Sequence, residues 1–406
     1  MAESHVIHNK YALPGRGSGE EVAIDAISKL LKEKGHNIVP YIRSSFEVPK
    51  MKLGRARAFF AGIYNVSAKR EMGKLLDREK PDLVFVQNLF PLISPSVLIA
   101  CGKANVPVVM RCPNYRLMCP SGLFMTNGTL CERCAGGKEY WCFLKNCEED
   151  IFKSTGYALR GFVANYFSLF KNNVDVFMVL TEFAKQKLMQ NGFSSRQVQV
   201  ISGLANPNGI RPSFSGNHGR YVGFVGRVSH EKGIDLFIEA AKILPEVTFK
   251  VAGNFDRTLD LVRQAPPNIE FTGQLDPDAL MEFYAQARMI VAPSKWYEGL
   301  PMAIIEAMLS GKPVICSDIG GLPEVVDDGI TGFLFHQDDV RGLAGNIQKL
   351  WSDQKLCHRM GMAAREKAEK AYGPDAFYQR FMNACESALR NKHVSELSQD
   401  VDIELT

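Results

Sequence analysis

Short apolar runs rich in β-branched residues alternate along the chain with longer segments that have the period of a helix. Continuous apolar runs of this kind are typical of parallel strands covered on both faces. The runs that we expect to form strands are 6–8, 37–39, 83–86, 106–109 and 174–180 in the first half, and 221–225, 247–251, 269–271, 289–291 and 313–316 in the second. The alternation predicts the α/β class, with two Rossmann-like domains that each contain a doubly wound parallel sheet.

The length of 406 residues also favours two domains, because a single domain takes about 150 residues on average. Residues 206–217 are rich in turn formers and are expected to form the linker. We therefore predict an N-terminal domain over 1–212, a C-terminal domain over 213–375, and a helix with a polar tail over 376–406. Ligands of doubly wound proteins bind at the carboxyl ends of the strands, so two such domains predict a cleft lined by both sheets.

Composition and charge exclude several classes of protein. Hydrophobic residues make up 46% and charged residues 23% of the chain, which excludes a disordered, collagen-like or coiled-coil protein. The net charge of +4 is too small to indicate nucleic-acid binding by itself. No run reaches the ~18 apolar residues of a membrane-spanning helix, and the first residues lack the features of a signal peptide. These observations predict a cytoplasmic protein, either free or held peripherally at the inner face of the membrane.

The segment 295–308 (KWYEGLPMAIIEAM) follows an expected strand and opens a helix near Pro301, a favoured first helical residue. Glycine and proline at this turn let the first backbone amides of the helix point outward, where they form an anion site. Glu298 lies in the loop, and Glu306 lies about two turns into the helix. One carboxylate can therefore reach distal hydroxyls of a ligand while the other reaches a ribose. The alternative is that both glutamates only solvate a helix.

A second segment, 224–233 (FVGRVSHEKG), is expected to form a strand, a tight turn and the start of a helix. Arg227 and Lys232 would both project into the cleft at the end of this strand. Two cations at that place can neutralise a nucleoside diphosphate leaving group, which is electrostatic stabilisation of the transition state. The alternative for both residues is a surface salt bridge.

Taken together, these segments resemble family 4 of the retaining glycosyltransferases, whose members have the GT-B fold. The resemblance continues through 320–324 (GGLPE) and 328–335 (DGITGFLF). It implies that Glu298 binds the hydroxyls of the donor sugar at the reaction centre, beside the catalytic cations Arg227 and Lys232. It also implies that Glu306 binds the ribose hydroxyls. The diphosphate would be held by the backbone of Gly299, Leu300, Pro301 and Met302.

The activity that this resemblance implies is transfer of a sugar from a nucleotide-diphosphate sugar to a saccharide or lipid-linked saccharide, as in bacterial surface polysaccharide synthesis. The anomeric configuration would be retained and no catalytic metal would be needed. UDP is the commonest nucleotide in the family. The alternatives are a non-catalytic GT-B partner subunit that binds a nucleotide sugar, and a GT-B epimerase or phosphorylase. A nucleic-acid-binding zinc knuckle ranks last, because acidic residues offset the basic residues near the cysteines.

Residues on the acceptor side are expected in the N-terminal half. In the resembling family, a glycine-rich loop closes over the diphosphate, and Gly17 and Gly19 occupy that loop here. Histidines that the family often carries near the acceptor are absent, since proline and Gln-Asn stand at the aligned positions. Asn88, Asn114 and Arg116 are therefore interpreted as contacts to the acceptor or the sugar. Without a general base, the departing phosphate oxygen would itself accept the acceptor's proton.

Six of the ten cysteines lie within 112–147, which we interpret as an insertion that shapes the acceptor site. A Cys-x2-Cys pair with further cysteines on either side has the spacing of a thiolate zinc site. The most symmetric set of ligands is Cys119, Cys131, Cys134 and Cys147. Reduced cysteines packed in a subdomain are an equal alternative, and disulfides are a third.

Basic and aromatic residues are interleaved over 50–74. Seven lysines and arginines lie there with a single acid, Glu71, and with Phe59, Phe60 and Tyr64 among them. A basic, aromatic helix of this kind could rest on an anionic membrane and collect a lipid-linked acceptor. The stretch 157–170 could assist it. The alternative is a solvated face with core aromatic residues beneath it.

Overall fold

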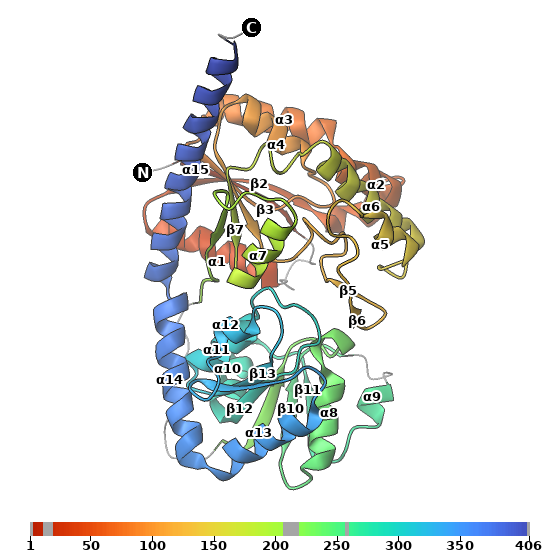
Figure 1. Cartoon of the computed structure of the whole chain (residues 1–406), viewed down its shortest axis with the longest axis vertical. Helices are drawn as coiled ribbons and strands as arrows, with labels where there is room; N and C mark the ends of the chain where they lie inside the picture. The colour runs from red at the N-terminus through yellow and green to blue at the C-terminus, as the bar shows by residue number, and fades with distance from the viewer. Residues whose placement is uncertain (1–2, 11–18, 206–218, 256–259, 404–406) are drawn as a thin grey trace. The chain divides into compact units, whose positions relative to one another are not determined.

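The structure is a computed structural model, and it describes residues 3–10, 19–205, 219–255 and 260–403. The chain divides into two compact units, each an α/β domain (Figure 1). The first unit comprises 1–126, 131–204 and 377–406, and the second comprises 127–130 and 205–376. The predicted linker and the limit at residue 212 lie outside the described residues, so the predicted domain limits stay predictions.

The first unit is built on a six-stranded parallel sheet with the order β2-β1-β3-β4-β7-β8. Its strands are β1 (Glu3–Lys10), β2 (Asn37–Ser44), β3 (Leu83–Asn88), β4 (Val108–Cys112), β7 (Val176–Val179) and β8 (Val198–Val200). Its α-helices are α1 (Gly19–Glu33), α2 (Gly54–Ile63), α3 (Val66–Glu79), α4 (Ser96–Lys103), α5 (Tyr140–Leu144), α6 (Ile151–Tyr166) and α7 (Glu182–Gln190). A short 3₁₀ helix, η1 (Ser45–Lys50), precedes α2, and β5 (Met125–Thr126) with β6 (Thr129–Leu130) forms a small hairpin.

The second unit contains another six-stranded parallel sheet, with the order β11-β10-β9-β12-β13-β14. Its strands are β9 (Tyr221–Val225), β10 (Phe249–Ala252), β11 (Ile269–Gly273), β12 (Ala287–Ala292), β13 (Val314–Ser317) and β14 (Gly332–Phe335). Its helices are η3 (His230–Lys232), α8 (Ile234–Ile243), α9 (Asp260–Arg263), α10 (Pro277–Gln286), α11 (Met302–Leu309), α12 (Leu322–Val325), α13 (Val340–Ser352) and α14 (Gln354–Tyr372). The prediction of two doubly wound parallel sheets is confirmed.

Successive residues of the central strands of the second unit enter two different cores. Val291 and Ile315 pack with α8 and α13, while Ile290 and Val314 pack with α11 and α14 on the opposite face. Alternate side chains of a strand point to opposite faces, so strands covered on both sides must be apolar throughout. This is the physical reason for the continuous apolar runs in the sequence.

The last helix, α15 (Pro374–Ile403), belongs with the first unit from Phe377 onward. Its residues Phe377 and Phe381 pack against Phe85 of β3 and Ile27 of α1 in one buried cluster. The Phe85 and Phe381 rings meet edge to face with 5.2 Å between their centroids. The first part of this helix is therefore a component of the core of the first unit.

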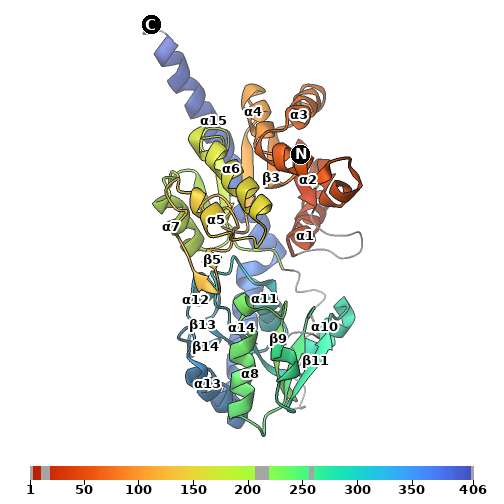
Figure 2. The same cartoon turned by 90° about the vertical axis from the view of Figure 1, so that its right-hand side faces the viewer.

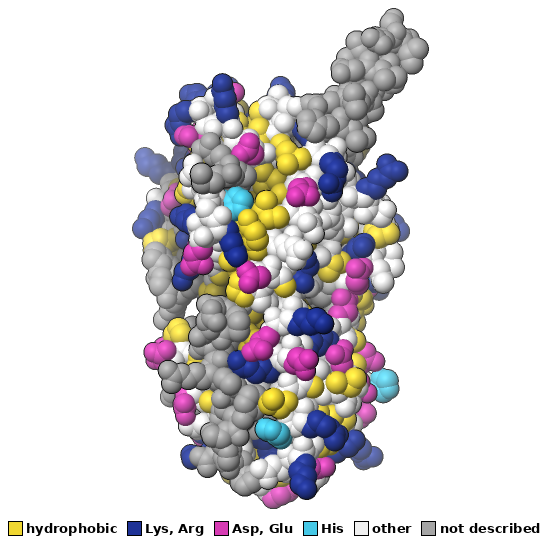
Figure 3. All heavy atoms as spheres, turned by 90° about the vertical axis from the view of Figure 1, so that its left-hand side faces the viewer, with side chains coloured by type: hydrophobic (Ala, Val, Ile, Leu, Met, Phe, Trp, Pro, Cys, Tyr) yellow, Lys and Arg dark blue, Asp and Glu magenta, His cyan; other side chains and the backbone are white. Residues whose placement is uncertain are grey.

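Charged side chains of both signs are interspersed over the face of the molecule shown in Figure 3, where a strip of hydrophobic side chains also reaches the surface of the first unit. In the part of the chain that the structure describes, no helix is both long and apolar enough to cross a membrane.

Candidate active site

The strand order of the second unit determines where its ligand site lies. The order is that of a classical doubly wound sheet, in which the chain reverses its direction of winding between β9 and β12. Loops that leave the carboxyl ends of these two neighbouring strands diverge there and leave a crevice. Arg227 and Lys232 follow β9, and Glu298 follows β12. The three predicted catalytic residues thus lie on the two loops beside the switch point, which is the place between β9 and β12 where the winding reverses.

An ion pair between the buried Glu298 and the partly exposed Lys232 joins these loops. Lys232 Nζ donates to both carboxylate oxygens of Glu298, at 2.8 and 3.0 Å, and Ser294 Oγ donates to Glu298 Oε1 at 2.6 Å. Glu298 is only 5% exposed. The same ammonium lies 5.3 Å from the centre of the Trp296 ring. Burial and these bonds fix the position of the Lys232 charge, and a fixed charge is suited to stabilising a developing negative charge.

Arg227 lies on the same loop but outside this pair. Its guanidinium pairs with Glu231, with 2.9 Å between Nη2 and Oε1, and its side chain is 63% exposed. The structure therefore brings Lys232 and Glu298 together and leaves Arg227 at the surface of the loop.

The loop that carries Lys232 is fixed by backbone contacts to the loop after β12. Gly233 has φ +71, and a Cβ at this position would lie 1.7 Å from the carbonyl oxygen of Pro293. Only glycine allows this approach together with this conformation. The Lys295 amide also donates to the carbonyl oxygen of Glu231 at 2.9 Å, and Lys295 Nζ pairs with Asp235 at 2.5 Å. Sequence reasoning did not single out Asp235 or Lys295, although Lys295 adjoins the motif.

Glu306 lies on α11, and its carboxylate accepts a hydrogen bond from Tyr284 Oη at 2.9 Å. Burial raises the pKa of Glu306, and the Tyr284 hydrogen bond lowers this pKa and offsets part of the rise. Tyr284 is fully buried, which raises its own pKa well above the ordinary value. The tyrosine hydroxyl is thus a permanent donor that orients the carboxylate.

The first turn of α11 follows Gly299 and Leu300. Pro301 is the N-cap, and its side chain makes no hydrogen bond to the helix. Helices need partners for their first amides, and a diphosphate can supply them. Gly299, Leu300, Pro301 and Met302 are all partly exposed, as a ligand-binding turn requires.

The residues predicted on the acceptor side lie in the first unit. Asn88 is buried, and its Nδ2 donates to the carbonyl oxygen of Asn9 at 2.6 Å, so it links the ends of β3 and β1. Asn114 Nδ2 donates to Glu20 Oε1 at 2.8 Å, and Asn114 Oδ1 accepts from the Arg116 amide. Gly19 begins α1, whereas Gly17 lies outside the described residues.

The sequence analysis did not group His8 with Gln87 and Arg111, which lie at the ends of neighbouring strands. All three are at least 94% buried, at the carboxyl ends of β1, β3 and β4. Arg111 Nη1 donates to Gln87 Oε1 at 3.3 Å. Both ring nitrogens of His8, Gln87 Nε2 and Arg111 Nε have no hydrogen-bond partner among the described residues. The available signal was a polar residue directly after the buried apolar run of each of these strands.

Burial changes the pKa values of two residues in this row, His8 and Arg111. It lowers the pKa of His8 to about 4 and the pKa of Arg111 to about 10. The imidazole is therefore neutral near pH 7, and the guanidinium stays charged. Buried polar groups without partners cost free energy, so the row is a candidate contact surface for the polar groups of a ligand.

The predicted zinc site is not supported. Among the residues that the structure describes, no group of three or more His, Cys, Asp or Glu side chains is arranged to hold a metal ion, and this includes Cys119, Cys131, Cys134 and Cys147. All ten cysteines are free thiols. The Cys142 thiol forms a hydrogen bond with Cys147 that lowers the pKa of Cys147 to about 6. The structure therefore has reduced cysteines packed in a subdomain.

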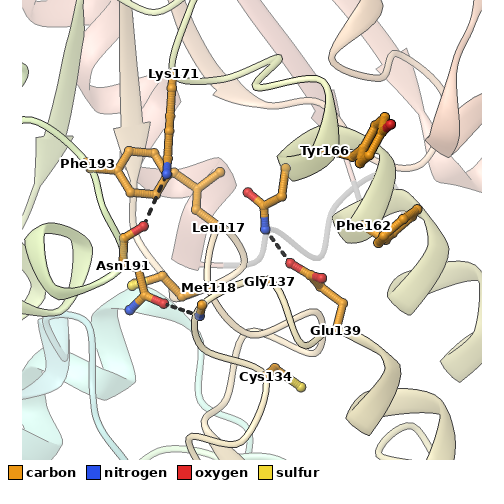
Figure 4. A pocket seen from close by; sticks show the side chains of 12 residues that line it. Leu117, Met118, Cys134, Gly137, Glu139, Phe162, Tyr166, Lys171, Asn191 and Phe193 are labelled. Atoms are coloured by element: carbon orange, nitrogen blue, oxygen red, sulfur yellow. Dashed lines mark hydrogen bonds between the residues drawn. The ribbon is translucent and has the colours of Figure 1, made fainter.

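This cysteine-rich insertion lines a pocket of about 420 Å³ in the first unit (Figure 4). Lys171 Nζ donates to the carbonyl oxygen of Asn191 at 3.2 Å on one side of the pocket. Glu139 lies on the other side and forms a hydrogen bond with Asn165, while the Phe162 ring lies nearby. The insertion thus builds a hollow with mixed polar and aromatic walls.

Comparisons with known proteins match the region of the chain that contains this site. Residues 210–367, which include both loops and both glutamates, match the sequence model of glycosyl transferases group 1. A relative from the capsule (cps) region of Klebsiella pneumoniae, an uncharacterised 42.6 kDa protein, is 24% identical over 79% of this chain and 86% of its own length. The sulfoquinovosyl transferase of Arabidopsis thaliana is 35% identical, but the match covers only 36% of this chain and 29% of that protein.

Solved structures extend the similarity to the whole fold. Sucrose-phosphate synthase from Thermosynechococcus elongatus aligns with a TM-score of 0.69, at 16% identity and over 100% of both chains. HepE from Anabaena, in complex with UDP and glucose, aligns with a TM-score of 0.65, at 16% identity, over 95% of this chain and 100% of that one. The protein is a glycosyltransferase with the GT-B fold. Within its second unit, residues 210–367 resemble the glycosyl transferases group 1 family.

Proposed function

We propose that this glycosyltransferase moves a sugar from a nucleotide-diphosphate sugar to a saccharide or lipid-linked saccharide, with retention of the anomeric configuration. One observation carries the proposal: the Lys232 ammonium is held on the buried carboxylate of Glu298 at the switch point of the second sheet. A second carboxylate, Glu306, follows on the next helix. A fixed cation can pair with the diphosphate of a nucleotide sugar. Two carboxylates can accept hydrogen bonds from the hydroxyl groups of the sugar and the ribose on either side of it.

Each residue of the second unit then has a role in donor binding or departure. Lys232 neutralises the charge that develops on the diphosphate as the sugar leaves, and Arg227 adds a second positive charge from the loop surface. The amides at the start of α11, from Gly299 to Met302, bind the phosphate oxygens. Glu298 contacts the sugar, and Glu306 accepts hydrogen bonds from the ribose. These charges take the place of a catalytic metal.

Residues of the first unit would complete the reaction. We assign Gly17 and Gly19 to the diphosphate, and Asn88, Asn114 and Arg116 to the acceptor or the donor sugar. The departing phosphate oxygen accepts the proton of the attacking hydroxyl, which then joins the sugar on the face that the phosphate left. Positioning and charge stabilisation supply most of the rate in such a reaction.

The proposed donor is a UDP-sugar, and the proposed acceptor belongs to a surface polysaccharide. HepE, which shares this fold, was crystallised with UDP-glucose. The Klebsiella pneumoniae relative is encoded in a capsule region, and a lipopolysaccharide outer core galactosyltransferase, WaaB, also shares the fold. These similarities support the donor and acceptor classes without identifying the sugar.

A thermal-shift screen against UDP-, GDP- and ADP-sugars tests this function. We expect stabilisation by one nucleotide class, followed by turnover in which the anomeric proton of the product keeps the donor configuration in NMR spectra. Stabilisation by none of the three would contradict the donor site. Donor binding without turnover with any acceptor would instead favour a non-catalytic GT-B partner subunit.

We also propose that the first unit contacts an anionic membrane surface. Leu53 and Phe60 are 81% and 67% exposed beside the basic residues of 50–74. Exposed apolar side chains next to lysines and arginines are typical of interfacial helices. The protein should sediment with anionic vesicles at low salt and be released as salt screens the charges. A lack of sedimentation at every salt concentration would refute this contact.

A further inference from the structure

The first unit contains a second cavity, which the proposed reaction does not use. It has a volume of about 270 Å³ and lies between α2 and α6, two helices that can be followed in Figure 2. Its lining consists of Val48, Arg55, Ala58, Phe59, Gly62, Pro91, Phe152, Lys153, Gly156, Tyr157 and Arg160. Most of these side chains are apolar or aromatic, and the polar ones are all cations.

Aromatic rings form the walls of this cavity. The Phe59 and Phe152 rings lie 4.9 Å apart between their centroids, and they join α2 to the first turn of α6. Gly156 lets the Phe59 ring approach α6, because a Cβ at this glycine would lie 2.8 Å from Phe59 Cδ2. The rings are therefore held in place by close packing, and the cavity between the helices is preformed.

Three basic side chains border the cavity. Arg55 pairs with Asp150 at 2.6 Å and stays 72% exposed, and Lys153 pairs with Glu148 at 2.5 Å. Arg160 is buried, with its guanidinium 3.7 Å from the centre of the Tyr157 ring. The Arg55 pair is exposed and contributes little to stability, whereas Glu148 in the other pair is only 12% exposed. The border can therefore accept a phosphate beside an apolar interior.

The helix that forms one wall of the cavity also carries exposed apolar side chains. Those of α6 and the residue that follows it include Ile151, Phe152, Leu159, Phe162, Tyr166 and Phe167. Of these, Phe152 lines this cavity, whereas Phe162 and Tyr166 line the first pocket. The basic residues of 50–74 lie on α2 and its neighbours, so the charge of the surroundings matches an anionic partner.

We propose that this cavity holds the hydrocarbon chain of a phosphate-bearing lipid, the lipid part of the acceptor, with its phosphate at Arg55 and Lys153. The inference rests on the proposed glycosyl transfer and names the acceptor class for it. A cavity of about 270 Å³ with apolar walls has room for a single hydrocarbon chain, whereas a cofactor-sized ligand needs a larger one. The cationic border and the exposed aromatic residues are what the interfacial region of an anionic membrane would contact.

Alkyl phosphates of six, eight, ten and twelve carbons, kept below their micelle concentrations, test the cavity by calorimetry. Each buried methylene should strengthen binding about fourfold until the cavity is full. Inorganic phosphate should bind far more weakly than decyl phosphate, because it leaves the apolar walls uncovered. Equal affinity for hexyl and decyl phosphate, or binding of neither, would overturn the proposal. This series uses the unmodified protein and needs no variant to fold.

A cavity-filling variant then connects the cavity to transfer. Ala58→Trp should lower the affinity for decyl phosphate at least tenfold and raise KM for a lipid-linked acceptor, with KM for the donor unchanged. Met189→Trp places the same bulk on an exposed site of α7 and should change neither value. Unchanged decyl phosphate affinity in a folded Ala58→Trp protein would contradict the proposal. Transfer to water-soluble saccharides that persists in that case would leave the proposed function standing.

Discussion

Replacing Lys232 by methionine is expected to lower kcat for sugar transfer about 100- to 1,000-fold, the range found when one charge-stabilising donor is removed from an active site. Methionine keeps most of the length and apolar volume of the side chain and removes only the ammonium. The variant loses the charge that faces the leaving diphosphate. It also leaves Glu298, which is 5% exposed, without its cation. Initial-rate kinetics with a saturating nucleotide sugar measure the effect.

The loss of the partner cation has a separate effect on stability. Breaking a buried ion pair by removing one member costs about 3–5 kcal/mol, because the remaining charge is uncompensated. Combining Lys232→Met with Glu298→Gln removes both charges, so Tm should recover while kcat stays low. Lys242→Met is the matched control, since Lys242 pairs with Glu239 at 2.7 Å on an exposed face of α8. If Lys232→Met keeps more than half of the wild-type kcat, Lys232 is not catalytic.

The positions of Glu298 and Glu306 could be predicted from the sequence because they depend on local structure. A strand, a glycine–proline turn and a helix suffice to place the first carboxylate in the loop after β12 and the second in α11, where it lies about one turn from the start of the helix and not the predicted two. That Lys232 would lie near this edge followed from the same reasoning on β9. In contrast, its bond to Glu298 depends on β9 and β12 being neighbours in the sheet. Apolar patterns reveal strands but not the order in which they pair, so this contact was not predictable.

The row of His8, Gln87 and Arg111 was missed for a related reason. Each residue alone is a polar residue at the end of an apolar strand. Only the order of the strands, with β3 between β1 and β4, brings the three ends together at one edge of the sheet, where the register shift after Ile7 pairs His8 with Asn88. The zinc site lacks support for a different reason. Cysteine spacing limits which thiolates can lie close together, whereas ligation requires a group of sulfur atoms arranged around a metal ion, and no such group is found among the described residues.

The second large effect concerns Glu306 and appears as a pH dependence. The ionised carboxylate accepts hydrogen bonds on both oxygens and more strongly than the protonated carboxyl, in which one oxygen carries a proton and the charge is lost. Burial raises the pKa of Glu306, so its carboxylate becomes protonated at a higher pH than an exposed glutamate does. The KM for the donor should therefore rise as the pH falls through this raised pKa. Glu306→Gln should raise KM about 10- to 100-fold, since hydrogen bonds to charged groups contribute about 1.5–3 kcal/mol, and should remove the pH dependence.

The same pKa shift makes the ligand-free protein less stable at higher pH. A carboxyl whose folded pKa lies above its unfolded pKa binds its proton more tightly in the folded state. Its stabilising contribution is complete below the unfolded pKa and is lost as the pH rises through the folded pKa. The pH change that favours donor binding thus opposes stability at this residue. Bound donor offsets the loss, because its hydroxyls satisfy the carboxylate.

Tyr284→Phe isolates the hydrogen bond that opposes this shift. Tyr284 Oη donates to Glu306 at 2.9 Å and lowers the pKa of the carboxylate, so its removal should raise that pKa further. The rise of donor KM should then begin at a higher pH in Tyr284→Phe than in the wild type, measured from about pH 5 to pH 8. Tyr221→Phe is the matched control, because Tyr221 Oη donates at 2.7 Å to the backbone oxygen of Phe283 and not to a carboxylate. Tyr221→Phe should lose stability without moving the pH profile. Superimposable profiles for Tyr284→Phe and the wild type would mean that the charge of Glu306 does not control donor binding.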